Sequence, residues 1–108
     1  MSRDFSIESI KQAILLSAIA LLRHTQELER IDSCAGDGDL GITMQKGAQA
    51  LQKEAENYGG EDVGEFLLKC AAAFNRAAPS TMGTLLASGL MRLGSIFKNK
   101  KRLTPDDV

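Results

Sequence analysis

Apolar side chains recur every three or four positions through most of this chain, the spacing that places them on one face of an α-helix. The first such stretch covers residues 6–31 and predicts one long helix, whose first free amides can donate to the Ser6 hydroxyl. A second helix is expected over residues 42–58, because Gly59 and Gly60 follow and can adopt the left-handed turn that ends helices.

The second half of the chain predicts two more helices separated by a sharp break. Asp62 and Glu65 are spaced as in a capping box, and an apolar helical face follows them. Pro79 ends this third helix because it biases Ala78 away from helical angles, and a new apolar pattern runs over residues 82–97. No segment shows the alternating pattern of a β-strand, so the expected fold class is all-α.

Small and flexible side chains complete the expected helix packing. Met44, Met82 and Met91 fall on helical faces and are expected to fill gaps in the core. Gly89 and Gly94 lie within the fourth predicted helix and would permit close packing against a neighbour.

The last residues have the composition of a helix start. Thr104 can cap a helix, Pro105 suits its first position, and Asp106 and Asp107 suit its first turn. The sequence then stops at Val108, which predicts that residues 1–108 are the front part of a longer domain. A frayed tail is the alternative.

The overall charge narrows the range of partners. Thirteen Lys and Arg residues against 14 Asp and Glu give a formal charge of −1, so no strong field attracts the chain to nucleic acid or to an anionic membrane. The N-terminus lacks the features of a signal peptide, and the longest apolar run is too short to span a bilayer. A cytoplasmic protein is the default expectation. Cys34 and Cys70 match neither a metal knuckle nor a disulfide framework and are expected to be buried thiols.

The strongest chemical signal lies between the first two predicted helices. Three aspartates and three glycines alternate there: Asp32, Gly36, Asp37, Gly38, Asp39 and Gly41. Carboxylates held this close repel one another unless a cation or many amide donors compensate, and magnesium commonly binds carboxylates together with phosphates. The glycines let the backbone approach a phosphate, whose charge the N-terminus of the next helix favours. The segment therefore predicts a magnesium and phosphate site, to which Thr43 would add a hydroxyl.

A calcium loop and a plain polar loop are the alternatives for the acidic segment. An EF-hand calcium loop requires Glu at its twelfth position, but the twelfth residue is Thr43 counted from Asp32 and Ala48 counted from Asp37. Neither frame fits, which argues against calcium. A polar loop in which Asp32 terminates one helix and Asp39 caps the next stays open as an alternative.

The sequence resembles the nucleotide-binding domain of dihydroxyacetone kinases, which occurs as a separate L subunit or as the C-terminal domain of single-chain enzymes. The residues that carry the resemblance are Asp32, Asp37, Asp39, Thr43, Met44 and Gly47, followed by Gly83 and Thr84. In that family the three equivalent aspartates hold magnesium ions that bridge the phosphates of ADP or ATP. The family fold is an eight-helix up-and-down barrel, so residues 1–108 would supply about its first half.

The resemblance implies nucleotide contacts close to the acidic segment. Gly38, Leu40, Gly41 and Thr43 are expected near the nucleotide and its phosphates. Leu40 stands where the family usually has a histidine, and this departure removes a polar contact.

A second nucleotide-contacting turn is expected at Ser80, Thr81 and Gly83. Residues 78–82 replace a family segment that is usually rich in serine and glycine, and the Ser80 and Thr81 hydroxyls would take over its polar contacts. Capping of the fourth helix is the alternative role for each hydroxyl.

These observations lead to one main hypothesis and two alternatives. The main hypothesis is a Mg²⁺- and ADP- or ATP-binding subunit of a dihydroxyacetone-type kinase, which transfers a phosphoryl group to a short keto-sugar largely by electrostatic stabilisation. No residue of the chain is an evident catalytic base. The resemblance implies a substrate-binding K subunit as partner, with a phosphocarrier protein as an alternative phosphoryl donor. The alternatives are a non-catalytic nucleotide-binding module and a helical interaction fragment completed by a second copy in a homo-oligomer.

Overall fold

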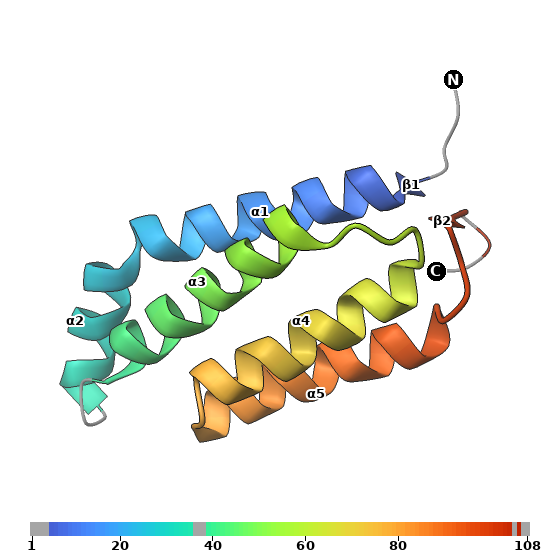
Figure 1. Cartoon of the computed structure of the whole chain (residues 1–108). Helices are drawn as coiled ribbons and strands as arrows, with labels where there is room; N and C mark the ends of the chain where they lie inside the picture. Colours follow the sequence, from blue (N-terminus) through green and yellow to red (C-terminus); the bar gives the residue numbers. More distant parts are fainter. Residues whose placement is uncertain (1–4, 36–38, 105, 107–108) are drawn as a thin grey trace.

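The computed structural model describes residues 5–35, 39–104 and 106, and it confirms the expected all-α class. Nearly all regular structure in this part of the chain is helical. In chain order the elements are β1 (Phe5–Ser6), α1 (Ile7–Arg23), α2 (Thr25–Ala35), α3 (Leu40–Asn57), α4 (Val63–Ala77), α5 (Thr81–Ile96) and β2 (Arg102–Leu103) (Figure 1).

Three helices begin at side chains that accept hydrogen bonds from the first free amides. Ser6 caps α1, Asp62 caps α4 and Ser80 caps α5, and each accepts from the amide three residues further on at 3.0–3.2 Å. The predicted caps at Ser6 and Asp62 are therefore confirmed. The predicted break after the third helix is confirmed as well, because α4 ends at Ala77 and Pro79 follows.

The first helical stretch is two helices, so the prediction of one long helix was wrong. His24 ends α1, and α2 leaves at a different angle (Figure 1). The Thr25 hydroxyl donates to the carbonyl of Leu21 at 3.2 Å, which satisfies one of the last carbonyls of α1. The Thr25 carbonyl itself packs against Gly41 of α3, a contact that sequence periodicity does not contain. Because α2 continues to Ala35, Asp32 belongs to a helix and not to the loop.

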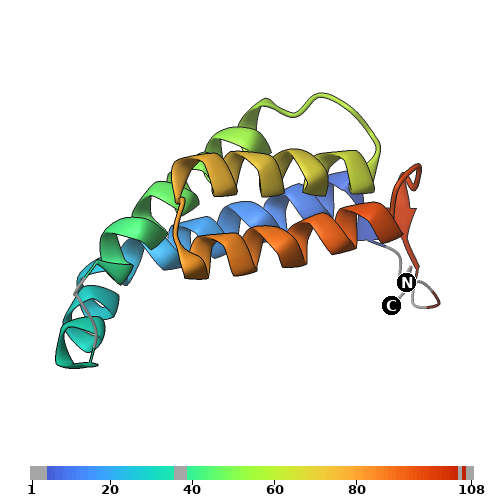
Figure 2. The ribbon, with the colours of Figure 1, turned by 90° about the horizontal axis from the view of Figure 1, so that it is seen from below.

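The four long helices α1, α3, α4 and α5 run alternately up and down, and each packs against the next in that order (Figures 1 and 2). Among the described residues, α1 and α5 share no comparable contact. The largest fully buried side chains are Val63, Phe66, Cys70 and Phe74, all from α4. The core is therefore centred on α4, between α3 and α5.

Glycines allow the closest helix contacts. A side chain at Gly47 of α3 would collide with the Phe74 ring, and one at Gly64 of α4 would collide with the backbone of the residues that end α5. The Cβ of a side chain at Gly94 would lie 2.7 Å from Leu68, which confirms the expectation of close packing there. Gly89, in contrast, has open space around it.

Several apolar and sulfur-containing residues are placed differently from the prediction. Met44 and Cys70 are buried as expected, but Met82, Met91 and Cys34 are exposed. Helical periodicity identifies an apolar face, yet it does not say whether another element covers that face. Cys34 is in the last turn of α2, which has no buried residue among those described.

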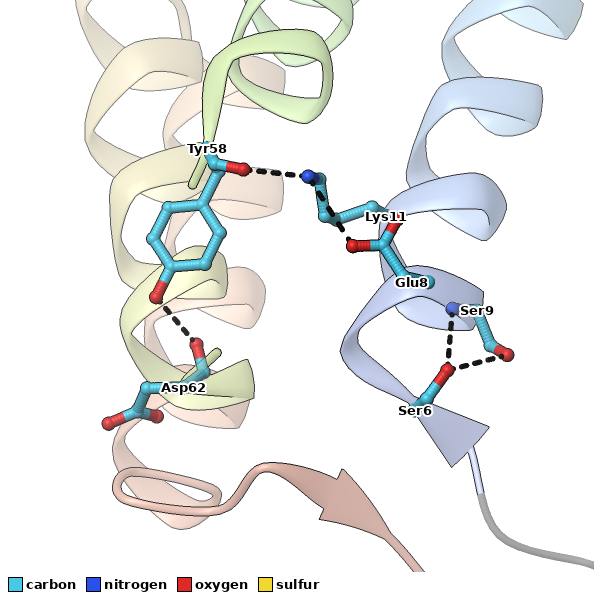
Figure 3. Close-up of polar contacts among 6 residues, drawn as sticks. All are labelled: Ser6, Glu8, Ser9, Lys11, Tyr58 and Asp62. Carbon is cyan, nitrogen blue, oxygen red and sulfur yellow. Dashed lines mark hydrogen bonds and ion pairs between the residues drawn. The ribbon is translucent and has the colours of Figure 1, made fainter. Parts of the chain in front are cut away.

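Hydrogen bonds connect segments that lie far apart in the sequence. β1 and β2 form a short antiparallel pair that the sequence did not predict. Lys11 Nζ donates to the Tyr58 carbonyl at 2.6 Å, and the Tyr58 hydroxyl donates to the Asp62 carbonyl at 3.0 Å (Figure 3). The Asp62 carboxylate also accepts from the Asn99 amide at 2.9 Å. Asp62 thus joins the start of α4 to the segment after α5.

Two further expectations concern the chain ends and the membrane. The predicted helix start at residues 104–107 cannot be followed, because Pro105 and Asp107 are outside the described residues. No described helix has the length and apolar content that crossing a membrane requires.

Candidate functional site

The junction of α2 and α3 brings two of the predicted metal ligands to one place. Asp32 lies near the end of α2, and Asp39 occupies the N-cap position of α3. The Leu40 amide donates to Asp32 Oδ2 at 3.3 Å, whereas the Asp39 side chain makes no capping hydrogen bond to α3. The Asp32 carboxylate is thus held at the positive end of α3, where the helix dipole favours negative charge.

Gly41 sets the distance between α2 and α3. The Cβ of any side chain there would lie 2.5 Å from the Thr25 carbonyl oxygen and 2.7 Å from the Glu29 Cβ. Only glycine therefore lets the two helices approach as closely as they do. Gly41 is buried behind the junction, so the structure gives it a positioning role for Asp32, and its contact with a ligand stays a prediction.

A cavity of about 400 Å³ opens in front of this junction, between α2, α3 and the first turns of α5. Its lining residues are Asp32, Asp39, Leu40, Thr43, Ser80, Thr81, Met82 and Leu85. Six of these eight were singled out from the sequence as site residues, although they come from three helices. The fold thus brings the acidic segment and the second predicted contact turn to opposite walls of one cavity.

The lining of the cavity is chemically mixed. Carboxylates and hydroxyls supply its polar groups, and the side chains of Leu40, Met82 and Leu85 supply apolar surface, of which Met82 and Leu85 are exposed. Sequence periodicity assigned Met82 to the core and gave no reason to single out Leu85, because neither residue carries a polar group that marks a site.

The turn before α5 shows both roles that the sequence left open. The Ser80 hydroxyl accepts from the Gly83 amide at 3.0 Å as the helix cap, and it also lines the cavity. Thr81 lines the cavity from the first turn of α5. Gly83 is buried against the Ala78 carbonyl, where a side chain would collide, so it supports the turn from below.

A second cavity, of about 740 Å³, lies on the other side of the Ser80 and Thr81 turn. It is lined additionally by Asn75, Pro79 and Thr84, and the Thr84 hydroxyl donates to Asn75 Oδ1 at 3.4 Å. Sequence reasoning missed Asn75, since a polar residue in the last turn of a helix carries no signal of a site.

Part of the predicted site falls outside the described residues, namely Asp37, Gly38 and the neighbouring Gly36. Within residues 5–35, 39–104 and 106, no three His, Cys, Asp or Glu side chains are grouped so that they could hold a metal ion. The three-aspartate ligand set therefore stays a prediction. The donors that are described, Asp32, Asp39 and the Thr43 hydroxyl, all offer oxygen, which suits a hard cation such as magnesium.

Comparison with known proteins gives a family and two named relatives. The family model for the DAK2 domain matches residues 34–108. L-erythrulose kinase of Pectobacterium atrosepticum is 35% identical over 86 residues, which are 76% of this chain and 14% of that protein. D-erythrulose kinase of Mycolicibacterium smegmatis is 36% identical over 88 residues, 80% of this chain and 15% of that protein. No solved structure gives a significant match.

The family model covers more than half of the chain, including α3, α4, α5 and the turns that line the cavity. The chain spans only about 14–15% of the length of the two relatives, so their complete activities are not carried over with the match. The family itself follows from the extent of the match: this chain belongs to the DAK2 domain family, as a domain of the dihydroxyacetone kinase type.

Proposed function

We propose that this domain binds magnesium and ADP or ATP in the cavity between α2, α3 and α5, and that it serves a kinase that phosphorylates a short keto-sugar. The observation that carries the proposal is the convergence of Asp32, Asp39 and Thr43 with Ser80 and Thr81 on one cavity. Two carboxylates and the Thr43 hydroxyl on one wall, with the Ser80 and Thr81 hydroxyls on the other, match the needs of a metal-bound phosphate chain.

The carboxylates would hold the magnesium. Asp32 and Asp39 supply two carboxylates at the N-terminus of α3, and Asp37, outside the described residues, would supply the third. Magnesium demands oxygen ligands and usually completes its shell with water and substrate phosphate. Bound magnesium would neutralise charge on the transferring phosphoryl group.

The remaining polar groups would orient the nucleotide. Amides of the first turn of α3 and the Thr43 hydroxyl would meet the phosphates from one side, and the Ser80 and Thr81 hydroxyls would meet them from the other. In this proposal the described carboxylates of the cavity, Asp32 and Asp39, are assigned to the metal, which leaves no described lining residue to act as a base on the accepting hydroxyl. The sugar would therefore be held by a different part of the enzyme, such as a K-type subunit or domain, and the two erythrulose kinases support a short keto-sugar as acceptor. A phosphocarrier protein as the phosphoryl donor is part of the same proposal.

Calorimetric titration with ADP tests the binding step directly. We expect binding with Mg²⁺ present and at least tenfold weaker binding after its removal with EDTA, since the metal bridges carboxylate and phosphate. Asp32→Asn retains an oxygen that can accept from the Leu40 amide but loses the charge, so it should bind Mg-ADP at least tenfold more weakly while keeping its helical circular dichroism. Asp39→Asn and Asp37→Ala should behave in the same way.

A matched control separates loss of the site from loss of charge. Glu56→Gln removes one negative charge from the exposed far end of α3 and should bind Mg-ADP as the parent chain does. Equal affinity with and without Mg²⁺, or an undiminished affinity in both Asp32→Asn and Asp39→Asn, would contradict the proposal.

A further inference from the structure

The charged side chains of α3, α4 and α5 are distributed unevenly along these helices. From the start of α3 to the end of α5, every acidic residue lies within residues 54–65, which comprise the end of α3, the connection and the first turn of α4. Every basic residue of the same three helices lies outside that segment. We call these basic residues the α3–α5 cations, which are Lys46, Lys53, Lys69, Arg76 and Arg92.

The acidic segment lies at the end of the molecule that is remote from the cavity. The Val63 amide donates to the Lys100 carbonyl, which places the start of α4 beside the chain segment that follows α5, and the cavity opens at the opposite ends of these helices (Figure 1). Lys46 lies in the second turn of α3, three residues after Thr43, and Arg76 is the last but one residue of α4. The helices around the cavity are therefore positively charged, although the formal charge of the whole chain is −1.

The charges of the α3–α5 cations are not neutralised by neighbouring carboxylates. All five side chains belong to exposed residues, and within residues 5–35, 39–104 and 106 none of them forms an ion pair. At the far end, in contrast, Lys11 pairs with Glu8, and Lys101 pairs with Glu61. The uncompensated positive charge is thus on the part of the three helices that leads to the cavity.

An anionic ligand needs such a field to enter this cavity. The carboxylates of Asp32 and Asp39 repel phosphate, and a nucleotide that has bound one Mg²⁺ still carries net negative charge. Lys46 is about 4.5 Å further along α3 than the cavity residue Thr43, well within the Debye length of about 10 Å at 0.1 M salt. Arg92 is about 16 Å along α5 from Thr81, so its field reaches the cavity only at lower salt.

We propose that the α3–α5 cations attract magnesium-bound ADP or ATP and steer it to the cavity, with Lys46 and Arg76 contributing most. This inference rests on the proposed function and adds the route by which the nucleotide arrives. Long-range attraction requires no contact, so charges scattered over three helices suffice, whereas docking of an acidic protein would require a contiguous basic patch. Steering of this kind raises association rates by about 10–1,000-fold in favourable cases.

Stopped-flow binding of a fluorescent ADP in the presence of Mg²⁺ measures the association and dissociation rate constants separately. For the parent chain, the association rate constant should fall as the salt concentration rises from about 0.01 M to about 0.5 M, because salt screens the attraction. Lys46→Gln combined with Arg76→Gln should lower it about threefold or more at the lowest salt, and the difference should disappear at the highest. The dissociation rate constant should change by less than about twofold, since charges that do not touch the ligand act mainly on association.

Two matched double variants separate the position of the charge from its amount. Lys98→Gln with Lys101→Gln removes equal charge from the far end and should change the association rate constant much less. Lys46→Arg with Arg76→Lys keeps both charges and should bind as fast as the parent chain.

Three results would overturn steering while leaving nucleotide binding in place. They are a parent association rate constant that does not fall with salt, equal effects of the two Gln double variants, and an effect of Lys46→Gln with Arg76→Gln on dissociation alone, which would indicate direct contact with the nucleotide. No binding of the fluorescent ADP or of unlabelled ADP to the parent chain would instead overturn the proposed function, and this inference with it.

Discussion

Cys70 is a buried titratable group whose environment gives a measurable effect on stability. Desolvation in the core of α4, with the charge of Glu54 as a second cause, raises the pKa of the Cys70 thiol from 9.0 to about 12. Burial likewise raises the pKa of Tyr58 above its usual 10.0, assisted by the charge of Glu65. Both groups are therefore neutral in the folded chain over a range in which the unfolded chain would ionise them.

Alkaline pH should destabilise the chain through Cys70. The unfolded thiol loses its proton near pH 9 and the folded one near pH 12, so the contribution is complete below pH 9 and is lost as the pH rises between these values. The free energy of unfolding should fall by at most about 1.4 kcal/mol per pH unit in this window. Urea denaturation at pH 8, 9.5 and 10.5 measures the slope. Cys70→Ala should lower the free energy of unfolding at pH 8 but make it depend less on pH. Tyr58→Phe removes the contribution of tyrosine to the pH dependence. An unchanged pH dependence in Cys70→Ala would contradict the assignment to Cys70.

The Asp62 side chain has two structural roles, so replacing it should lower the free energy of unfolding more than is usual for a partly exposed residue. Asp62→Ala loses the cap of α4 and the acceptor for the Asn99 amide, and we expect a loss of about 1–3 kcal/mol in urea denaturation. Asp62→Asn keeps one acceptor oxygen and should lose less. The neighbouring Glu61→Ala, which breaks only the exposed ion pair with Lys101, should change stability by no more than about 0.5 kcal/mol. Similar losses for Asp62→Ala and Glu61→Ala would argue against the double role.

At the scale of helices, two glycines should respond in opposite directions to the same substitution. Gly64→Ala would force a methyl group against the Gly94 carbonyl and the backbone at Lys98, and we expect about 1–3 kcal/mol of destabilisation as α4 and α5 separate. Gly89→Ala meets open space and should stabilise α5 by about 0.5–1 kcal/mol through helix propensity. Thermal and urea unfolding at low micromolar concentration compare the two. Equal changes in stability for the two variants would mean that helix propensity, and not the close approach of α4 and α5, determines the effect of Gly64→Ala.

The helices also show which parts of the fold the sequence could predict. Starts at Ser6 and Asp62 and the break at Pro79 were predictable because each depends on residues within one turn. The break at His24 was not predicted because the apolar periodicity runs on through it, and the close approach of Gly41 to the Thr25 carbonyl beside the break is a contact between different helices that local patterns do not contain. Among the residues that line the 400 Å³ cavity, Asp32, Asp39 and Thr43 were singled out from the acidic, glycine-rich segment, and Leu40, Ser80 and Thr81 from the family resemblance. Leu85 of this cavity and Asn75 of the second one became recognisable only when the helices were placed together.

At the scale of the whole molecule, stability should be concentrated at α4 and decrease toward α2. α4 is packed between α3 and α5 and supplies the largest fully buried side chains, while no described residue of α2 is fully buried. Local opening is easiest where few apolar contacts are lost. Amide hydrogen exchange should therefore be slowest in α4 and fastest in α2, apart from the chain ends.

Binding at the cavity should change this pattern selectively, which connects the arrangement of the helices with the proposed function. Asp32 lies near the C-terminal end of α2 and Asp39 at the start of α3, so a ligand held by both carboxylates would oppose separation of the two helices. Saturating Mg²⁺ and ADP should slow exchange at least tenfold in the last turns of α2 and in the first turns of α3 and α5, with little change in the middle of α4. Asp32→Asn should abolish the selective protection, and Glu56→Gln should preserve it. Uniform slowing over all helices would instead indicate general stabilisation and would place the ligand outside the junction of α2, α3 and α5.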